Sequence, residues 1–323
     1  MQEKRRCAVV VSLNPCVDKT LWIDKFIYGG TNRVQRSRED VAGKGTNVCV
    51  AFRSLGQDCI CVGFDYAGSK KTVAQRLAEC GGRSEMVTLP GAMRVNMKLF
   101  ERTTGVMSEV NEKGEPISAE HLQQLFEAYK SVLEALHPDS MVILTGSIPP
   151  GVPSDIYYTM IQMAKAHGIR TLLDASGEPL LRGADAVPFA MKPNQDEIGQ
   201  LLNRSIETLE EALEGAKELV QRGVEYCCVS LGAEGAVLVT KEHAYQAPAL
   251  KVEVRGIQGA GDSLVAGMTI ALMQGRAQKE ALQYAVAAAG GSVMRDGTLM
   301  CTKEDFEMLL DKVEIFDENR LNF

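Results

Sequence analysis

The chain of 323 residues is 45% hydrophobic and 24% charged, and its net charge is −7 at neutral pH. This composition is typical of a globular protein with a sizeable core and argues against a disordered chain. The negative charge argues against a general nucleic-acid binder, which needs a basic face. No apolar run approaches the roughly 18 residues of a membrane span.

The nine cysteines are scattered, and no C-x-x-C pair occurs. Several lie in apolar runs, such as Cys7 and the pair at 227–228, which is typical of free buried thiols in a reducing compartment. The apolar run behind the charged N-terminus covers only residues 7–13, too short for the core of a secretory signal. We therefore expect a cytoplasmic protein without a zinc site.

Short apolar runs alternate with amphipathic segments along the chain. Ser118 can cap a helix with apolar residues at 122–136, and Thr208 and Glu211 form a capping box before a second helix. This alternation predicts a mostly parallel sheet covered by helices on both faces, and without linker-like stretches we expect one domain over residues 1–323. The predicted strands are 7–13, 60–64, 141–145, 171–174, 227–231 and 236–240.

Two segments interrupt this rhythm. Residues 21–34 and 94–110 are strand-like but polar, with turn signals at Tyr28-Gly-Gly and Arg102-Thr-Thr-Gly. Such ribbons can form a small antiparallel flap over a site, or they can be surface hairpins without a role.

Polar or glycine-rich residues follow most of the predicted strands. Ligands of open α/β sheets bind at the carboxyl ends of the strands, so these loops are expected to share one ligand face. They are residues 14–18, the Thr-Gly-Ser run at 145–147, Asp174, the Lys-Pro-Asn run at 192–194, and the Ser-Leu-Gly run at 230–232.

The sharpest motif is the Gly-Ala-Gly-Asp run at 259–262, followed by an apolar helical segment to residue 274. A glycine turn before a helix N-terminus binds anions through free N–H groups and the helix dipole. Asp262 would repel such an anion, so it makes better sense as a base that takes a proton from an attacking hydroxyl. The alternative is an ordinary helix cap.

A second glycine loop reads Ala-Gly-Lys-Gly-Thr-Asn at 42–47. It matches neither the P-loop nor the dinucleotide-binding pattern. Its glycines and Lys44 suit close approach to a polar ligand, or a plain turn before a helix. Farther along, Asn194 and Glu197 share a helical face that can orient Mg²⁺ through water, or they simply begin a helix.

Together and in this order, these motifs resemble the ribokinase-like phosphofructokinase-B (pfkB) family of carbohydrate kinases, from Asn14 to about Gly297. The runs at 12–18, 94–98 and 145–151 are most similar to its 1-phosphofructokinase and tagatose-6-phosphate kinase branch. The resemblance implies a three-layer α/β/α sandwich with a mostly parallel sheet. It also implies a β-sheet lid built from about 14–34 and 92–113, through which two subunits can pair.

The resemblance also implies roles for individual residues. Asp262 would be the base, and the N–H groups of Gly259, Ala260 and Gly261 would hold the transferring phosphoryl group. The remaining implied residues fall into three groups. The sugar would be held by Asp18, Gly43 and Asn47, and its phosphate by Lys44 and Arg94, with Ser147 and Lys98 as further candidates. The ATP site would be lined by Lys192, Asn194, Ser230, Gly232, Gly235 and Gly261. Mg²⁺ would be organised by Asn194 and Glu197.

We therefore expect ATP-dependent phosphorylation of a ketohexose monophosphate, with fructose 1-phosphate before tagatose 6-phosphate or fructose 6-phosphate. Arg94 distinguishes a phosphorylated acceptor from a free sugar, because a guanidinium can bind a phosphate bidentately and a kinase of free sugars does not need it. The alternatives are a kinase of an unphosphorylated sugar or nucleoside and a non-catalytic sugar-phosphate sensor. The sensor is suggested by the unusual Ile257-Gln258 before the glycine turn.

Overall fold

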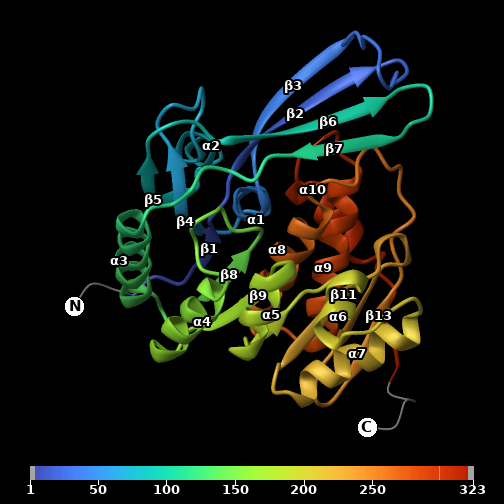
Figure 1. Cartoon of the computed structure of the whole chain (residues 1–323). Coiled ribbons are helices and arrows are strands. Elements are labelled where there is room, and N and C mark those ends of the chain that lie inside the picture. Colours follow the sequence, from blue (N-terminus) through green and yellow to red (C-terminus); the bar gives the residue numbers. More distant parts are fainter. Residues whose placement is uncertain (1–3, 298, 319–323) are drawn as a thin grey trace.

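In the computed structural model, which describes residues 4–297 and 299–318, the apolar runs of the sequence form the middle of one large sheet (Figure 1). Every residue of β1 (Ala8–Ser12) and β8 (Met141–Thr145) is buried. The sheet is parallel except at one edge, where three strands run antiparallel. The order is β14 (Phe316–Asp317), β13 (Ala244–Ala247), β12 (Ala236–Val239), β11 (Tyr226–Ser230), β10 (Ala190–Met191), β9 (Arg170–Asp174), β8, β1, β4 (Cys59–Tyr66) and β5 (Arg83–Leu89).

Helices cover both faces of this sheet, as the alternation in the sequence predicts. The predicted caps are confirmed: Ser118 accepts a hydrogen bond from the His121 N–H, and Thr208 and Glu211 form a capping box. One layer contains α3 (Ala119–Ala135), α4 (Ile156–Ala166), α5 (Gly177–Asp185), α6 (Gln195–Leu202) and α7 (Leu209–Gln221); the other contains α1 (Lys44–Ser54), α2 (Val73–Glu79), α8 (Ala260–Met273), α9 (Gln278–Val293) and α10 (Lys303–Leu310) (Figure 1).

Helix α8 is unusual because residues on all its sides are buried, from Asp262 to Leu272. A helix that is apolar all round has no face for solvent and must lie in the interior. It packs between α1 and α9. Its first turn therefore carries Asp262 into the interior of the molecule.

A second, four-stranded sheet stands apart from the large one, at the top of Figure 1. Its order is β3 (Arg36–Ala42), β2 (Cys16–Ile23), β6 (Arg94–Glu101) and β7 (Met107–Asn111). The expected antiparallel pairing holds within each hairpin, whereas β2 and β6 pair in parallel. We call this sheet the lid.

The boundaries of the first lid ribbon differ from the prediction. Its strands are β2 and β3, and the predicted segment 21–34 is mostly the connection between them. A lid segment ending at residue 34 therefore omits β3. Most of β3 is exposed or only partly buried, so its residues show no apolar alternation that could mark a strand. The second ribbon matches β6 and β7.

No described helix is long and apolar enough to span a bilayer. All nine cysteines are free, and only Cys80 is not fully buried.

The strand order reverses between β1 and β8. From β1 the chain crosses to β4 and then β5 on one side, whereas β8 and the following strands lie on the other. The connections leave the sheet in opposite directions at such a point, which opens a crevice at the carboxyl ends of the strands. This crevice is where the predicted ligand loops after β1 and β8 meet.

The N-terminus of α1 approaches the end of β1 very closely. A Cβ atom on Gly45 would lie 2.5 Å from the Cβ and 2.8 Å from the Cα of Ser12. Gly43, the N-cap residue, has a φ of 107°, a region that favours glycine. Both glycines of the loop therefore have steric reasons to be there, and they fix where Lys44 and Asn47 lie.

We expect Gly45→Ala to lower the free energy of unfolding by about 1–3 kcal/mol, because α1 must move away from β1 to make room. Urea unfolding measures the change. Gly261→Ala is the matched control, since Gly261 is also the second residue of a helix and its Cβ would meet nothing within 4 Å. Equal stability of the two variants would contradict the close-approach argument.

Candidate active site

The crevice at the ends of β1 and β8 contains a small pocket of 170 Å³. Polar side chains from four separate parts of the chain line it, as the positions of the strand ends predicted. They include Asn14 after β1, Lys44 at the start of α1, Arg94 at the start of β6, and Ser147 after β8. Lys44, Arg94 and Ser147 are thus brought together, as expected for residues that share one ligand.

Asp262 and Asn47 meet although they lie far apart in the sequence. Asn47 Nδ2 donates a hydrogen bond of 2.8 Å to Asp262 Oδ2. The turn before α8 is made possible by Gly259, whose φ is 75°. The N-terminal turns of α1 and α8 therefore face each other, and the predicted base is held by a residue of the early glycine motif.

The pKa of Asp262 is shifted toward neutrality. Burial raises this pKa to about 6, Lys44 acts to lower it, and the negative charge of Asp174 raises it further. A carboxylate with this pKa is ionised at pH 7 and binds a proton more readily than an exposed aspartate does. These are the properties of a general base in a closed site.

Asp174 lies at the centre of a charged cluster. Lys44 Nζ and Lys192 Nζ each lie 3.2 Å from Asp174 Oδ1, and the Thr145 hydroxyl donates to Oδ2 at 3.0 Å. Burial acts to raise the pKa of Asp174, but the two ammonium groups outweigh it, and the net pKa lies below its usual range. The sequence placed Asp174 at a strand end without a role. The structure makes it the link between Lys44 and Lys192.

Asp18 and Lys98 form a buried ion pair inside the lid. Lys98 Nζ lies 2.6 Å from Asp18 Oδ2, and each side chain is 7% exposed. Cys16 Sγ and Asn96 Nδ2 both donate to Asp18 Oδ1, at 3.3 Å. Lys98 is therefore engaged with the carboxylate predicted to hold the sugar. Cys16 and Asn96 are neighbours that the sequence did not assign.

Arg94 is fastened to the protein by four hydrogen bonds. Nε and Nη2 both donate to the Asn14 carbonyl oxygen, at 3.3 and 3.2 Å, and Nη1 donates to Glu112 O and Asn96 Oδ1, at 2.8 and 3.2 Å. A guanidinium has five N–H groups, so one is left. The bidentate grip on a phosphate expected from the sequence is therefore not available in this arrangement, because two backbone carbonyls and the Asn96 side chain occupy the other donors.

Lys192, Asn194 and Ser230, three of the residues predicted to line a nucleotide site, lie at or beside the start of α6, whereas Gly261 lies in the first turn of α8. Asn194 caps this helix, and Glu197 accepts a hydrogen bond from the Asn194 N–H in return. Asn194 also pairs with Ser230 in an isolated bridge, which brings the two loops together. Gly232 begins a short 3₁₀ turn, and Gly235 directly follows it. At Gly235, φ is 100° and a Cβ would lie 2.0 Å from Ala247 O.

The acidic residues nearby do not form a ready-made metal cage. In the described ranges, no group of three or more His, Cys, Asp or Glu side chains is placed to hold an ion. The capping box uses Asn194 Oδ1 and Glu197 Oε2, and the Glu197 side chain lies close enough to influence Lys44. This arrangement suits Mg²⁺ that arrives with phosphate groups and keeps its waters, because one or two carboxylates then suffice.

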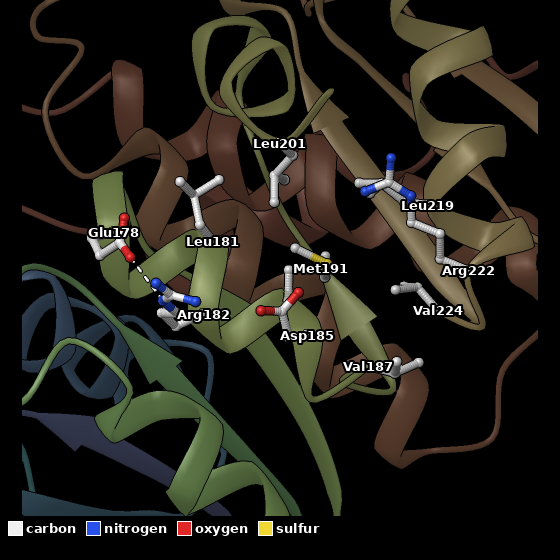
Figure 2. Close-up of a pocket in the computed structure, with 11 residues that line it drawn as sticks. Glu178, Leu181, Arg182, Asp185, Val187, Met191, Leu201, Leu219, Arg222 and Val224 are labelled. Atoms are coloured by element: carbon white, nitrogen blue, oxygen red, sulfur yellow. Dashed lines mark hydrogen bonds and ion pairs between the residues drawn. The ribbon is translucent and has the colours of Figure 1, made fainter. Parts of the chain in front are cut away.

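A separate pocket of 470 Å³ lies between α5, α6 and α7 (Figure 2). Arg182 and Asp185 come from α5, Leu201 from α6, and Arg222 from the end of α7, around a floor that includes Met191. Arg182 is paired with Glu178 at 2.8 Å. None of the predicted site residues lines this pocket.

Comparison with known proteins identifies the family of the chain. The sequence profile described as pfkB family carbohydrate kinase matches residues 5–305. The chain belongs to the pfkB family of carbohydrate kinases. The predicted family and ribokinase-like fold are thereby confirmed.

Individual relatives of this pfkB kinase match over nearly their whole length. The 1-phosphofructokinase of Bacillus subtilis (strain 168) is 32% identical over 305 residues, which cover 94% of this chain and 98% of the relative. A tagatose-6-phosphate kinase of Staphylococcus epidermidis is 27% identical, with 96% and 99% covered. Phosphofructokinase-2 from Escherichia coli, in complex with substrates and products, has a TM-score of 0.86 at 25% identity, with 96% and 99% covered.

We expect Asp174→Asn to destabilise this pfkB kinase by about 3–5 kcal/mol, because it removes the ion-pair partner of the buried Lys192 ammonium. Urea unfolding at pH 7 measures the loss. Glu178→Gln removes a carboxylate from an exposed pair on α5 and should cost less than about 0.5 kcal/mol. If both variants lost the same small amount, Asp174 would not be the electrostatic centre of the cluster.

Proposed function

We propose that this pfkB kinase transfers the γ-phosphoryl group of ATP to a hydroxyl of a ketohexose monophosphate, with fructose 1-phosphate as the first candidate. The observation that carries the proposal is the buried Asp262 at the start of α8, held by Asn47 beside the pocket that Lys44 and Arg94 line. A carboxylate with a raised pKa next to a cationic pocket suits a base that acts on a phosphorylated acceptor.

The chemistry follows from this arrangement. The acceptor hydroxyl, oriented by Asp18, Gly43 and Asn47, attacks the γ-phosphorus of ATP as its proton passes to Asp262. The bond from the γ-phosphorus to the bridging oxygen breaks, and ADP leaves with the electron pair. Phosphoryl transfer depends mainly on positioning and on stabilising negative charge. The N–H groups of Gly259, Ala260 and Gly261 at the start of α8 are suited to the second task.

The positive charges support a phosphorylated acceptor over a free sugar. Lys44 and Arg94 line the pocket at the ends of β1 and β8, with Ser147 beside them and Lys98 behind Asp18. We assign Lys44, Arg94 and Ser147 to the sugar phosphate. The similarity to 1-phosphofructokinases supports fructose 1-phosphate, and the tagatose-6-phosphate kinase relatives support tagatose 6-phosphate as the second candidate.

We assign the nucleotide to the loops around α6. Lys192, Asn194, Ser230, Gly232 and Gly235 would contact ATP, and Glu197, oriented by its capping bonds with Asn194, would hold Mg²⁺ through water. Mg²⁺ would neutralise charge on the phosphates. A non-catalytic sugar-phosphate sensor is the remaining alternative, and Asp262 argues against it, because a carboxylate near a phosphoryl group weakens simple binding.

We also propose that two copies of the cytoplasmic enzyme pair through their lids. Eight of the fourteen exposed large hydrophobic side chains in the described residues lie in the lid or its connections. A cluster of this kind marks an interaction surface. A relative, phosphofructokinase-2 from Escherichia coli, has a tetrameric inhibited form. The eight are Phe26, Ile27, Tyr28, Val34, Met97, Val106, Met107 and Val110.

The proposal is tested by measuring ADP release from ATP with a panel of acceptors. The panel contains fructose 1-phosphate, fructose 6-phosphate, tagatose 6-phosphate, fructose, tagatose and ribose, each with Mg²⁺ and without it. We expect the highest kcat/KM for a ketohexose monophosphate. Preference for a free sugar would overturn the substrate class, and the absence of turnover with every acceptor would favour the sensor.

We expect Asp262→Asn to lower kcat by about 10²-fold or more while KM for ATP changes little, because the variant cannot take the hydroxyl proton. Steady-state kinetics with the best acceptor of the panel measures both constants. Asp196→Asn, which removes an exposed carboxylate from the first turn of α6, should leave kcat unchanged. Wild-type turnover in Asp262→Asn would end the assignment of the base.

The pH dependence follows from the pKa of Asp262. Because burial raises this pKa to about 6, the free enzyme loses its ionised base as the pH falls through that value. We expect kcat/KM to fall about tenfold per pH unit below roughly pH 6. The residual activity of Asp262→Asn should lack this acidic limb, and an unchanged limb in the variant would assign the titration to another group.

A further inference from the structure

Asn14 fastens the lid to the pocket at the end of β1. Its Nδ2 donates to the carbonyl oxygen of Lys113, at 3.1 Å, and to the hydroxyl of Ser147, at 3.2 Å. Lys113 lies just past β7, where the chain leaves the lid, and Ser147 lies in the loop after β8. Asn14 is 8% exposed, and its side-chain amide thus joins the segment after β7 to the loop after β8, which share no strand pairing.

The backbone of Asn14 holds Arg94 as well. Its carbonyl oxygen accepts two hydrogen bonds from the guanidinium, which account for half of the four that fix Arg94. The direction of the one remaining N–H of Arg94 therefore depends on where Asn14 lies. Arg94 and Ser147, both assigned to the sugar phosphate, are oriented by the same residue.

The packing around Asn14 leaves little freedom for this arrangement. Asn14 Oδ1 is buried without a hydrogen-bond partner in the described structure, on the side of Gly114. A Cβ on Gly114 would lie 2.6 Å from this oxygen, and the φ of Gly114 is 94°. The side chain is thus clamped with its amide donor toward Lys113 and Ser147, although burying the free carbonyl is unfavourable.

We infer that Asn14 is a positioning residue that sets the affinity of the pocket for phosphorylated acceptors, by fixing Arg94 of the lid and Ser147 of the loop after β8 relative to each other. The inference rests on the proposed function. It implies that losing the amide weakens sugar-phosphate binding and leaves the nucleotide side, around α6 and Lys192, unaffected. A residue that merely stabilised the fold would affect both substrates together.

The experiment compares Asn14→Ala with the wild-type enzyme, using the best sugar phosphate of the panel and the matching free sugar. We expect KM for the sugar phosphate to rise about 10- to 100-fold, which is the loss of affinity typical of a broken hydrogen bond to a charged or oriented group. KM for ATP should stay within about twofold of the wild-type value. Preference for the phosphorylated over the free acceptor should fall by a similar factor. Asn111→Ala is the matched control, because its amide bonds only to Glu109 on the exposed β7.

Two further variants keep the test decisive. Asn14→Asp preserves the shape of the side chain but turns an acceptor toward Lys113 O, so it should raise KM for the sugar phosphate while KM for ATP stays near that of the wild type. Asn14→Ala and Ser147→Ala should be less than additive, because they share one hydrogen bond.

The outcomes separate the two hypotheses. A wild-type enzyme that phosphorylates no acceptor of the panel would refute the proposed function before any variant is made. An active wild type with an unchanged sugar-phosphate KM in Asn14→Ala would overturn the role of Asn14 alone. A parallel rise of both KM values would also overturn it, because it would indicate general damage to the fold.

Discussion

The site depends on the contact between Asp174 and two lysines. Lys44 lies at the N-terminus of α1, and Lys192 directly follows β10. Asp174 is the last residue of β9, and its Oδ1 atom lies 3.2 Å from the Nζ atom of each lysine. Removing such charges from water costs several kcal/mol per ion, so the cluster is stable only because each charge has partners. The same pairing places two positive charges before any ligand arrives, and preorganised charge stabilises developing negative charge without reorganisation at the moment of reaction.

The cluster also bears on the proposed role of Asp262 as a base at neutral pH. With Asp174 and Asp262 ionised, two negative charges face the two positive charges of Lys44 and Lys192, and the group is close to neutral. The lysines keep Asp262 ionised, while Asp174 and burial keep its pKa near 6. Phosphate groups of incoming substrates add negative charge, which raises the pKa of Asp262 further. Binding therefore makes the carboxylate a stronger proton acceptor when an acceptor hydroxyl lies beside it.

The parts of the molecule predicted from the sequence are those with a local signal. The buried strands, the caps at Ser118 and Thr208, and the turn before Asp262 depend on neighbouring residues, and all are found. Asp174 and Arg94 depend on partners far away in the chain. The sequence shows that Arg94 carries a guanidinium group with several N–H donors. It does not show that the backbone carbonyls of Asn14 and Glu112 accept hydrogen bonds from these donors. β3 escaped prediction for a different reason, since a strand exposed along most of its length carries no periodic pattern.

The lid has little hydrophobic core of its own, so polar contacts must hold it to the rest of the protein. Every residue of β7 and the first part of β3 are exposed, so few apolar contacts stabilise the sheet. Such an element belongs to the least stable part of a protein unless other contacts hold it. At its base, the buried Asp18–Lys98 pair and the bonds of Arg94 and Asn14 supply those contacts. The connection between β2 and β3 carries exposed apolar side chains, such as Tyr28, that a second surface can cover. The polar contacts that hold the lid therefore lie beside the proposed site, where a bound sugar phosphate would add its own charges, whereas exposed apolar side chains such as Tyr28 lie in the connection between its strands.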